Sequence, residues 1–225
     1  MDHSKHHHHD HNVESQVKTN VTYNDGKVFI ELEDDTGSPP ELAIQHDKKM
    51  HFIMVSNDLE AYYHLHPEKE QPGYYSVNQA LSDGTYQAFV DIAPENKTYQ
   101  IMPNTLQVGT DETSKAKANL DGKDHWTKER NGKTVTLNAV DATVGEDVPL
   151  VFDTHGEKPD PYLGALGHVV IVDEDVEHYI HVHPETDNTT TFNAHFSKPG
   201  MYKIWAEFKF GDDVNAYPFI IEVKE

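Results

Sequence analysis

The sequence predicts an all-β protein built from two tandem antiparallel β-sandwich domains that arose by internal duplication. Three observations support this fold class. Short segments rich in Val, Ile, Phe, Tyr and Thr recur between Gly, Asp and Asn turns, long amphipathic helical runs are missing, and blocks of sequence occur twice. At 225 residues the chain has room for one large domain or for two domains of about 100 residues each.

The duplication is visible in three blocks that follow one another in the same order in both halves. The first pair of blocks is offset by 117 residues and the second by 116. The paired blocks are MHFIMVSNDLEAYYHLHP (50–67) with GHVVIVDEDVEHYIHVHP (167–184), GTYQAFVDI (84–92) with GMYKIWAEF (200–208), and NDGKVFIELE (24–33) with TVGEDVPLVFD (143–153). Three separated blocks repeated in one order indicate a duplication, so each half is expected to fold as one sandwich.

The repeat divides the chain into four segments. Residues 1–14 are a His-rich tail that cannot build a core, so we expect disorder there. Residues 15–112 and 130–225 are the two β-sandwich repeats, and the polar stretch 113–129 is the linker between them. The clearest strands are expected at 28–33, 51–56, 61–66, 84–92 and 99–108, with counterparts at 148–153, 168–173, 178–183, 200–208 and 217–223.

Each half contains the pattern His-x12-His-x-His-Pro, and this spacing predicts a cluster of histidines. A tight hairpin centred on Asp58–Leu59 pairs residues whose numbers sum to 117. His51 then lies opposite His66, with His64 on the same face of the sheet. The inference depends on the register, because a shift by one residue would move His51 to the other face. The second hairpin, with a pair sum of 351, repeats the arrangement with His168, His181 and His183.

Three imidazoles at one place predict a site for a divalent transition metal in each repeat. Neutral imidazole suits Cu(II) and Zn(II), whereas Ca(II) and Mg(II) prefer oxygen ligands. A set of three histidines leaves a fourth position for water, a carboxylate or a ligand from a partner. Asp91 and Glu207 occupy equivalent places in the two repeats. They are expected either to complete the metal shell or to fix a histidine N–H, unless they are exposed acidic strand residues. We therefore expect two metal equivalents per folded chain.

The N-terminal tract MDHSKHHHHDHNVESQ is a second candidate region for metal binding. A native tract of this composition would gather ions loosely, whereas the alternative interpretation is a purification tag. The formal net charge of −21 argues against nucleic acid and anionic membrane surfaces as partners and favours cations. The absence of cysteine excludes disulfides, thiolate metal sites and a blue-copper electron-transfer centre. The tail histidines are His3, His6, His7, His8, His9 and His11.

Several other residues are expected to have structural roles. Trp205 and Phe89 lie at equivalent repeat positions, which favours a place in the core. Asp58 and Asp175 are expected to form turns, because Asp hydrogen-bonds the backbone there. The histidines without a repeat counterpart are expected at the surface: His46, His125, His155, His178 and His195.

The repeated blocks, together with PGMYKIWAEFKFGDDV and YPFIIEV in the second half, resemble bacterial secreted or lipid-anchored His-rich domains. Those domains are cupredoxin-like or immunoglobulin-like sandwiches that often accompany heavy-metal resistance systems. The resemblance covers both halves but neither the tail nor the linker, and its most specific part is Gly-His…His-x-His-Pro in the second half. The first half has Met50 where the second has Gly167, which implies a different affinity.

This resemblance implies an extracytoplasmic location, as a secreted protein or a cell-surface lipoprotein, and an association with copper or zinc. A mature lipoprotein begins with a lipidated Cys, and the sequence contains none. Contact with a membrane is therefore expected only through an anchor outside the given sequence.

Taken with the histidine pattern, the expected function is non-enzymatic binding of Cu(II) or Zn(II) for sequestration, buffering or delivery outside the cytoplasm. The expected partners are metal ions and a metal transporter or other metal-handling protein. Two alternatives stay open at this point. One is a metalloenzyme whose open three-histidine centre activates water. The other is a module for adhesion or assembly in which the histidines are incidental.

Overall fold

The structure, a computed structural model, describes residues 14–110, 118, 120, 126–182, 184, 186 and 188–225. All but the last residue of the predicted tail and most of the predicted linker therefore lie outside the described residues. Every regular element in the described part of the chain is a β-strand, so the predicted all-β fold class is confirmed. None of these residues belongs to a helix long and apolar enough to span a membrane.

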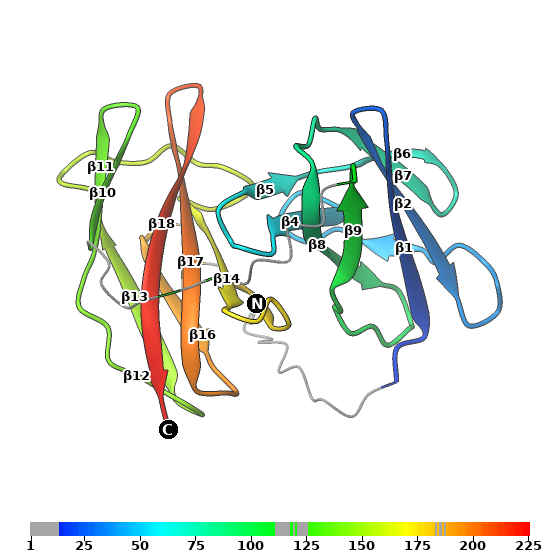
Figure 1. Cartoon of the computed structure of the whole chain (residues 1–225). Helices are drawn as coiled ribbons and strands as arrows, with labels where there is room; N and C mark the ends of the chain where they lie inside the picture. The colour runs from blue at the N-terminus through cyan, green and yellow to red at the C-terminus, as the bar shows by residue number, and fades with distance from the viewer. Residues whose placement is uncertain are drawn as a thin grey trace.

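Each half of the chain contributes nine described strands, and the two halves lie side by side (Figure 1). The first half contains β1 (Val17–Asn24), β2 (Lys27–Asp34), β3 (Leu42–Ala43), β4 (Met50–Ser56), β5 (Tyr62–Leu65), β6 (Glu68–Gln71), β7 (Tyr74–Asn78), β8 (Gly84–Pro94) and β9 (Asn104–Val108). The second contains β10 (Thr127–Arg130), β11 (Lys133–Leu137), β12 (Ala142–Thr143), β13 (Asp147–Asp153), β14 (His168–Asp173), β15 (Tyr179–Val182), β16 (Thr191–His195), β17 (Gly200–Phe210) and β18 (Asp213–Lys224).

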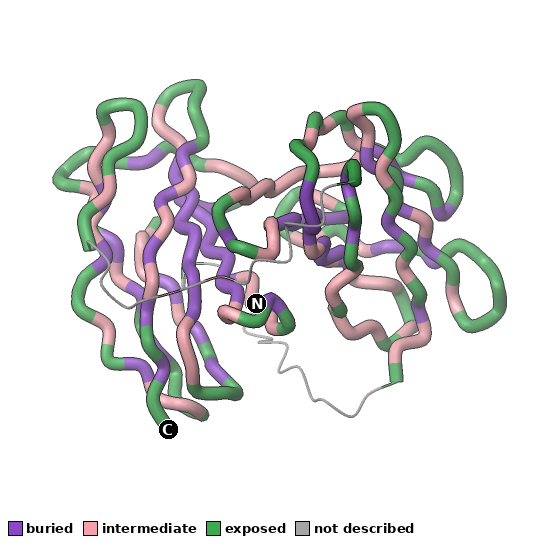
Figure 2. The backbone as a smooth tube through the Cα atoms, in the orientation of Figure 1, coloured by how far each residue is buried: buried purple, intermediate pink, exposed green. Residues whose placement is uncertain are grey.

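Two sheets face each other in each half, which makes both halves β-sandwiches as predicted. The first domain packs the sheet β1-β2-β7-β6 on the sheet β3-β8-β4-β5, with β9 added beside β8. The second domain packs β10-β11-β13-β16 on β12-β18-β17-β14-β15. Each pair of sheets encloses its own hydrophobic core, and the buried stretches follow the facing strands (Figure 2). Alternate residues of each strand point into these cores because side chains alternate across a sheet.

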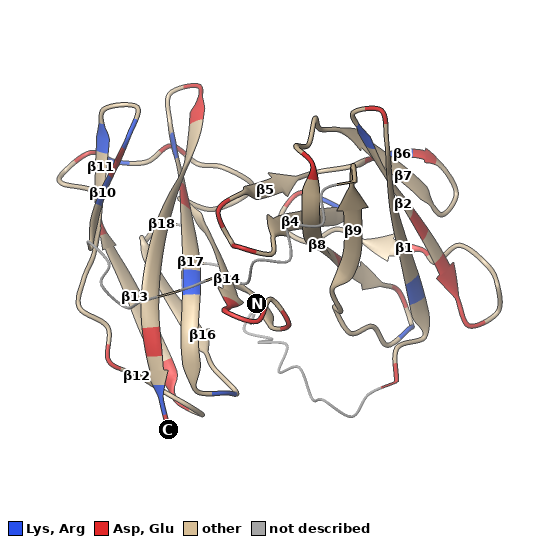
Figure 3. Cartoon of the chain, viewed as in Figure 1, with Lys and Arg blue, Asp and Glu red and all other residues tan. Residues whose placement is uncertain are grey.

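The two sandwiches are joined by a third cluster of buried apolar side chains, here called the interdomain core. It forms because β4 and β14 are buried on both faces. Phe52 points into the core of the first domain, whereas its neighbours Ile53 and Val55 point into the interdomain core. β4 and β5 carry no charged side chain along their lengths (Figure 3). The interdomain core consists of Ile53, Val55, Leu59, Phe89, Val170, Val172, Val176, Tyr179 and Trp205.

The contact between the domains is reciprocal. Tyr62 of the first domain stacks on Trp205 of the second, with ring centroids 4.7 Å apart. The equivalent residues repeat this contact in the other direction, because Tyr179 stacks on Phe89 at 5.0 Å. Equivalent residues that exchange contacts in this way define a pseudo-two-fold axis between the domains. Phe89 and Trp205 are thus core residues as predicted, but the core that contains them is the one between the two sandwiches.

Two details of the predicted boundaries differ from the structure. The strand expected at 99–108 is limited to Asn104–Val108, with Tyr99 anchored instead through its hydroxyl to the Val90 carbonyl at 2.7 Å. The predicted linker 113–129 ends earlier, because Thr127–Arg130 already pairs with β11. Two described linker residues, Ala118 and Leu120, pack against the interdomain core.

Candidate metal centre

The hairpins β4–β5 and β14–β15 adopt the register that the spacing predicts. Phe52 pairs with Leu65, so the residue numbers sum to 117. Val169 pairs with Val182, so the sum in the second repeat is 351. Asp58 caps the first turn as expected, since its Oδ1 accepts a hydrogen bond from the Glu60 N–H at 3.0 Å. The register places the histidines on the faces that carry Ile53 and Val170, and these are the faces turned toward the other domain.

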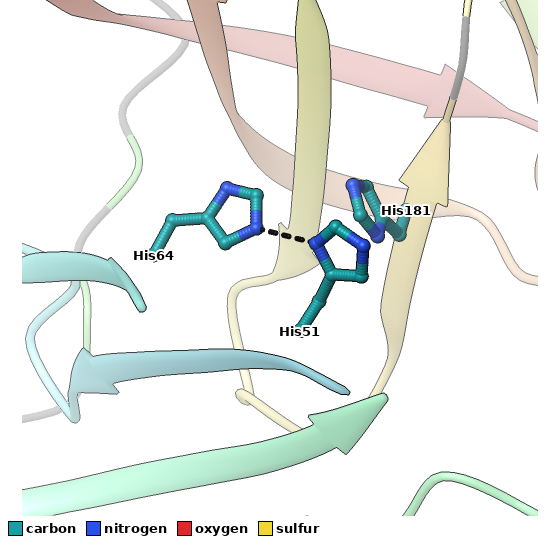
Figure 4. A group of neighbouring side chains, drawn as sticks. All are labelled: His51, His64 and His181. Atoms are coloured by element: carbon teal, nitrogen blue, oxygen red, sulfur yellow. Dashed lines mark hydrogen bonds between the residues drawn. The ribbon is translucent and has the colours of Figure 1, made fainter. Parts of the chain in front are cut away.

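The described histidines of the two motifs form one cluster between the domains, whereas the sequence predicted one cluster in each repeat. The ligand nitrogens of His51, His64 and His181 all lie within 4.8 Å of one another. Two of these residues come from the first domain and one from the second, and their rings point toward one another (Figure 4). The rings of His64 and His181 are 5.4 Å apart, and His168 lies 5.8 Å from His181. The spacing of residues within a hairpin predicts which histidines share one face of that hairpin. It does not predict how two hairpins pack against each other.

Backbone carbonyl groups fix one histidine on each inner strand. Nε2 of His51 lies 3.2 Å from the carbonyl oxygen of Gln45. In the second repeat, Nε2 of His168 lies 3.0 Å from the carbonyl oxygen of Tyr162. Gln45 and Tyr162 occupy equivalent tight turns, closed by bridges to Lys48 and to Ala165. Since a carbonyl oxygen only accepts, both rings donate from Nε2 and keep the lone pair on Nδ1.

Carboxylates fix one histidine on each edge strand, and each carboxylate comes from the opposite domain. Nδ1 of His64 donates to Glu207 Oε2 at 2.6 Å. In the reciprocal contact, Nδ1 of His181 donates to Asp91 Oδ2 at 2.9 Å. Of the roles considered for Asp91 and Glu207, fixing a histidine N–H is the one this geometry provides. A carboxylate on the far nitrogen sets the tautomer, so the lone pair of each ring lies on Nε2 and faces the cluster.

These anchors place two lone pairs face to face. Nδ1 of His51 and Nε2 of His64 are 3.0 Å apart. Both rings already donate from their other nitrogen, so two neutral rings have no hydrogen left to place between them. The close approach therefore requires a cation shared by the two nitrogens, either a proton or a metal ion.

Burial disfavours protonation of His51. Desolvation, followed by the nearby His64 ring, lowers the pKa of His51 to about 4. Desolvation likewise lowers the pKa of His168 to about 4 and that of His181 well below its usual value. These lowered pKa values favour the neutral state of His51, His168 and His181, which is the state that ligates a metal.

Two tyrosines, the half-buried Tyr62 and the buried Tyr179, lie beside the carboxylates. The hydroxyl of Tyr179 donates to Asp91 Oδ2 at 3.1 Å, the same oxygen that His181 contacts. Burial and the adjacent carboxylate raise the pKa of Tyr179, and burial with Glu207 does the same for Tyr62. Both hydroxyls thus stay protonated at neutral pH. The sequence predictions missed these tyrosines, although both precede the His-x-His-Pro motif at the same distance in each repeat.

The Gly-His pair of the second repeat has a packing explanation. A Cβ atom on Gly167 would lie 2.7 Å from the Glu207 carbonyl oxygen and from the ring of Phe208. The close approach of β17 therefore requires glycine beside His168. The equivalent Met50 instead fills the core of the first domain.

The remaining histidines, both predicted ligands and predicted surface residues, lie in different places. His66 joins the cluster, with its ring 5.1 Å from His51 and 4.9 Å from His64. His46 is exposed as predicted, but it lies at the edge of the cluster, 6.4 Å from His51. His155 and His195 are exposed, and His178 is half-buried against Asp173. Outside the described residues lie His183, His125 and the tail histidines His3, His6, His7, His8, His9 and His11.

The chain matches one family over both repeats. The family is described as a domain of unknown function, DUF8832, and the match covers residues 6–110 and 128–225. The chain therefore belongs to this family, with its domain present in two regions, which agrees with the tandem duplication. No curated protein matches the chain.

Similar solved structures are distant. Three FN domains of chicken CNTN1 show 9% identity and a TM-score of 0.27, with 95% of this chain and 68% of that chain covered. The Escherichia coli adhesin FdeC shows 14% identity and a TM-score of 0.28, covering 94% of this chain and 65% of FdeC. The Yersinia pseudotuberculosis adhesin InvE shows 12% identity and a TM-score of 0.23, covering 92% of this chain and 58% of InvE. The chain thus spans less than two thirds of either adhesin chain.

Proposed function

We propose that the chain binds a divalent transition metal, Cu(II) or Zn(II), at the histidine cluster between its two domains. The observation that carries this proposal is the pair of facing nitrogens, His51 Nδ1 and His64 Nε2, 3.0 Å apart. Their other nitrogens are engaged with Gln45 and Glu207, so both lone pairs are directed at one point. Tetrahedral bonds of about 2.0 Å to one metal ion would set two ligand nitrogens roughly 3.3 Å apart.

Charge balance supports a doubly charged ion. Asp91 and Glu207 are 16% and 7% exposed in their side chains, and each is hydrogen-bonded to a cluster histidine. Two carboxylates beside neutral imidazoles leave two negative charges in a buried place, which is costly without a counterion. A divalent cation among the histidines would neutralise both. The donor set of nitrogens favours Cu(II) and Zn(II) over Ca(II) and Mg(II).

The biological role that suits such a site is holding the ion for sequestration, buffering or delivery to a metal transporter or another metal-handling protein. The resemblance to secreted His-rich domains and the chain's net charge of −21 favour this role outside the cytoplasm. Extracytoplasmic placement, secreted or lipid-anchored, is part of the proposal.

The test measures metal binding by the full chain with the six tail histidines replaced by Ser, called here the tail-silenced chain. After treatment with a chelator, titration with ZnCl2 and CuCl2 near neutral pH is followed by calorimetry. We expect dissociation constants below about 1 µM and a loss of at least about 100-fold in His64→Ala. His195→Ala, at an exposed histidine on β16, is the matched control and keeps the parental affinity.

Two outcomes would overturn the proposal. One is a tail-silenced chain that binds neither ion more tightly than about 100 µM. The other is equal affinity in His64→Ala and His195→Ala. Turnover of ester or bicarbonate by the zinc-loaded chain, lost in His64→Ala, would instead support the metalloenzyme alternative. An adhesion or assembly module with incidental histidines would bind no ion and would be equally stable with and without chelator.

A further inference from the structure

We propose that the site holds a single Zn(II) ion with four histidine ligands, two from each domain: His51, His64, His168 and His181. This inference rests on the proposed metal-binding function and adds the fourth ligand, the stoichiometry and the preferred ion. The four rings share one property. Each is fixed by a partner on its outer nitrogen, Gln45 O, Tyr162 O, Glu207 or Asp91, so that the inner nitrogen bears the lone pair.

The four rings form a tetrahedron. The six centroid separations are 5.3, 6.3, 5.1, 6.1, 5.4 and 5.8 Å. Metal–nitrogen bonds of about 2.0 Å at tetrahedral angles put imidazole centroids roughly 5 Å apart. A square-planar arrangement would make two diagonals longer than the four edges by a factor of about 1.4, as Cu(II) prefers. The separations of opposite rings, 6.3 and 5.4 Å, are close to the others, so the arrangement suits Zn(II).

His168 fits the fourth position better than His66 does. The ring of His168 lies 6.3, 6.1 and 5.8 Å from those of His51, His64 and His181. Among the described residues, the ring contacts of His66 are with two histidines of its own domain, at 5.1 and 4.9 Å. Its buried Nε2 also has no hydrogen-bond partner among the described residues, so no contact at that nitrogen orients the ring. Ligating histidines are normally oriented by such a partner.

Symmetry limits the site to one ion. The pseudo-two-fold axis exchanges His51 with His168 and His64 with His181. The trio His51, His64 and His181 would thus have a symmetric copy made of His168, His181 and His64. The two trios share two imidazoles. Each of these has one inward lone pair and can ligate one ion at a time, so both trios belong to one site. One ion per chain replaces the two equivalents that the sequence suggested.

A closed four-histidine shell is suited to holding an ion. No position is left for a substrate or an activated water, which separates this site from open catalytic zinc centres. Because each domain provides two ligands, the ion also links the two sandwiches. Release of the ion then requires the two hairpins to move apart.

The experiment uses the tail-silenced chain and measures stoichiometry, geometry and ligand identity together. We expect calorimetry with ZnCl2 to give one equivalent. We expect CoCl2 to give the intense visible absorption of tetrahedral Co(II), removed by one equivalent of Zn(II). His168→Ala should lose at least about 100-fold in Zn(II) affinity, and His66→Ala should lose less than about 5-fold. If His168→Ala fails to fold by circular dichroism, His168→Gln replaces it.

The outcomes separate this inference from the function on which it rests. Two bound equivalents, weak octahedral-type Co(II) absorption, or a larger loss in His66→Ala than in His168→Ala would overturn the four-histidine site while leaving metal binding in place. Absence of any Zn(II) or Cu(II) binding by the tail-silenced chain would overturn the proposed function itself.

Discussion

The contact between the two domains has an apolar part and a histidine part, and they behave differently. The interdomain core is dominated by apolar side chains such as Val55, Phe89 and Val172, so its burial is favourable without any bound ion. The histidine part turns lone pairs toward one another beside two carboxylates, so it is electrically incomplete without a cation. The comparison indicates that the domains dock through apolar burial. Docking then brings the proposed metal ligands of the two domains together.

The largest expected effect comes from the apolar part. Trp205→Ala removes a side chain that is 3% exposed and stacks on Tyr62. We expect a loss of about 3–5 kcal/mol in the free energy of unfolding, because a large cavity opens in the interdomain core. Denaturant unfolding followed by circular dichroism measures it. Trp126→Ala, at the other tryptophan, is the control and changes stability little, since Trp126 is 39% exposed. Equal losses in both variants would contradict the role of the interdomain core.

The pH dependence of the metal-free protein tests the histidine part. The pKa of His168 is lowered to about 4 by burial, with His64 and His46 adding to the effect and Glu207 opposing it. Between pH 6.5 and 4 the unfolded chain therefore binds more protons than the folded one, so stability falls as the pH falls through this range. His168 alone would account for roughly 3 kcal/mol.

Thermal unfolding measured from pH 7.5 to pH 4 tests this expectation. His168→Gln should show a flatter profile than the parent, because one titrating group has been removed from the buried cluster. Parallel profiles of the parent and the variant would show that His168 does not carry the pH dependence.

Removing one carboxylate should weaken metal binding without abolishing it. Asp91→Asn and Glu207→Gln each take a charge from the outer nitrogen of a ligand, so we expect Zn(II) affinity to fall about 10- to 100-fold. Asp147→Asn is the matched control, because it alters a carboxylate beside the exposed His195. Calorimetric titration compares the three. Unchanged affinity in both test variants would exclude a part for the carboxylates in binding.

The smallest expected effect concerns Lys203, a buried lysine that reaches from the second domain to the first. Nζ of Lys203 donates to the carbonyl oxygen of Leu59 at 2.7 Å. Lys203→Met leaves that carbonyl without its donor, so we expect a loss of about 1–2 kcal/mol in stability and no change in metal affinity. The exposed Lys198→Met should have no effect on either measurement. A change in metal affinity on Lys203→Met would show that the two parts of the contact are coupled.

Much of the fold was predictable from the sequence because the duplication allowed the strands of each half to be checked against those of the other half. The hairpin register was correct, since a two-residue spacing fixes which side chains share a face. The sequence analysis did not predict that the hairpins β4–β5 and β14–β15 lie against each other. The unbroken apolar runs FIMV and VVIV, in β4 and β14, were the available signal, since a strand with one wet face alternates polar and apolar residues. The carbonyl groups of Gln45 and Tyr162 had no such signal, because any residue provides a carbonyl.

The turns at the tips of the two hairpins contain an unfavourable backbone conformation in both halves. Leu59 and Val176 adopt positive φ angles of 59° and 58°, which bulky and β-branched residues rarely do. Both side chains are nevertheless buried in the interdomain core.

The reciprocal contacts between the domains have an evolutionary consequence. A surface that fits its own duplicate also fits itself, so a single-repeat ancestor with this face would have paired with a second copy of the same chain. In that pair every change to a ligand would have occurred twice. Fusion removed that constraint, and the halves have since diverged at His46 and Leu163 in the turns beside the cluster. The two sides of the proposed metal centre can thus evolve separately within one chain.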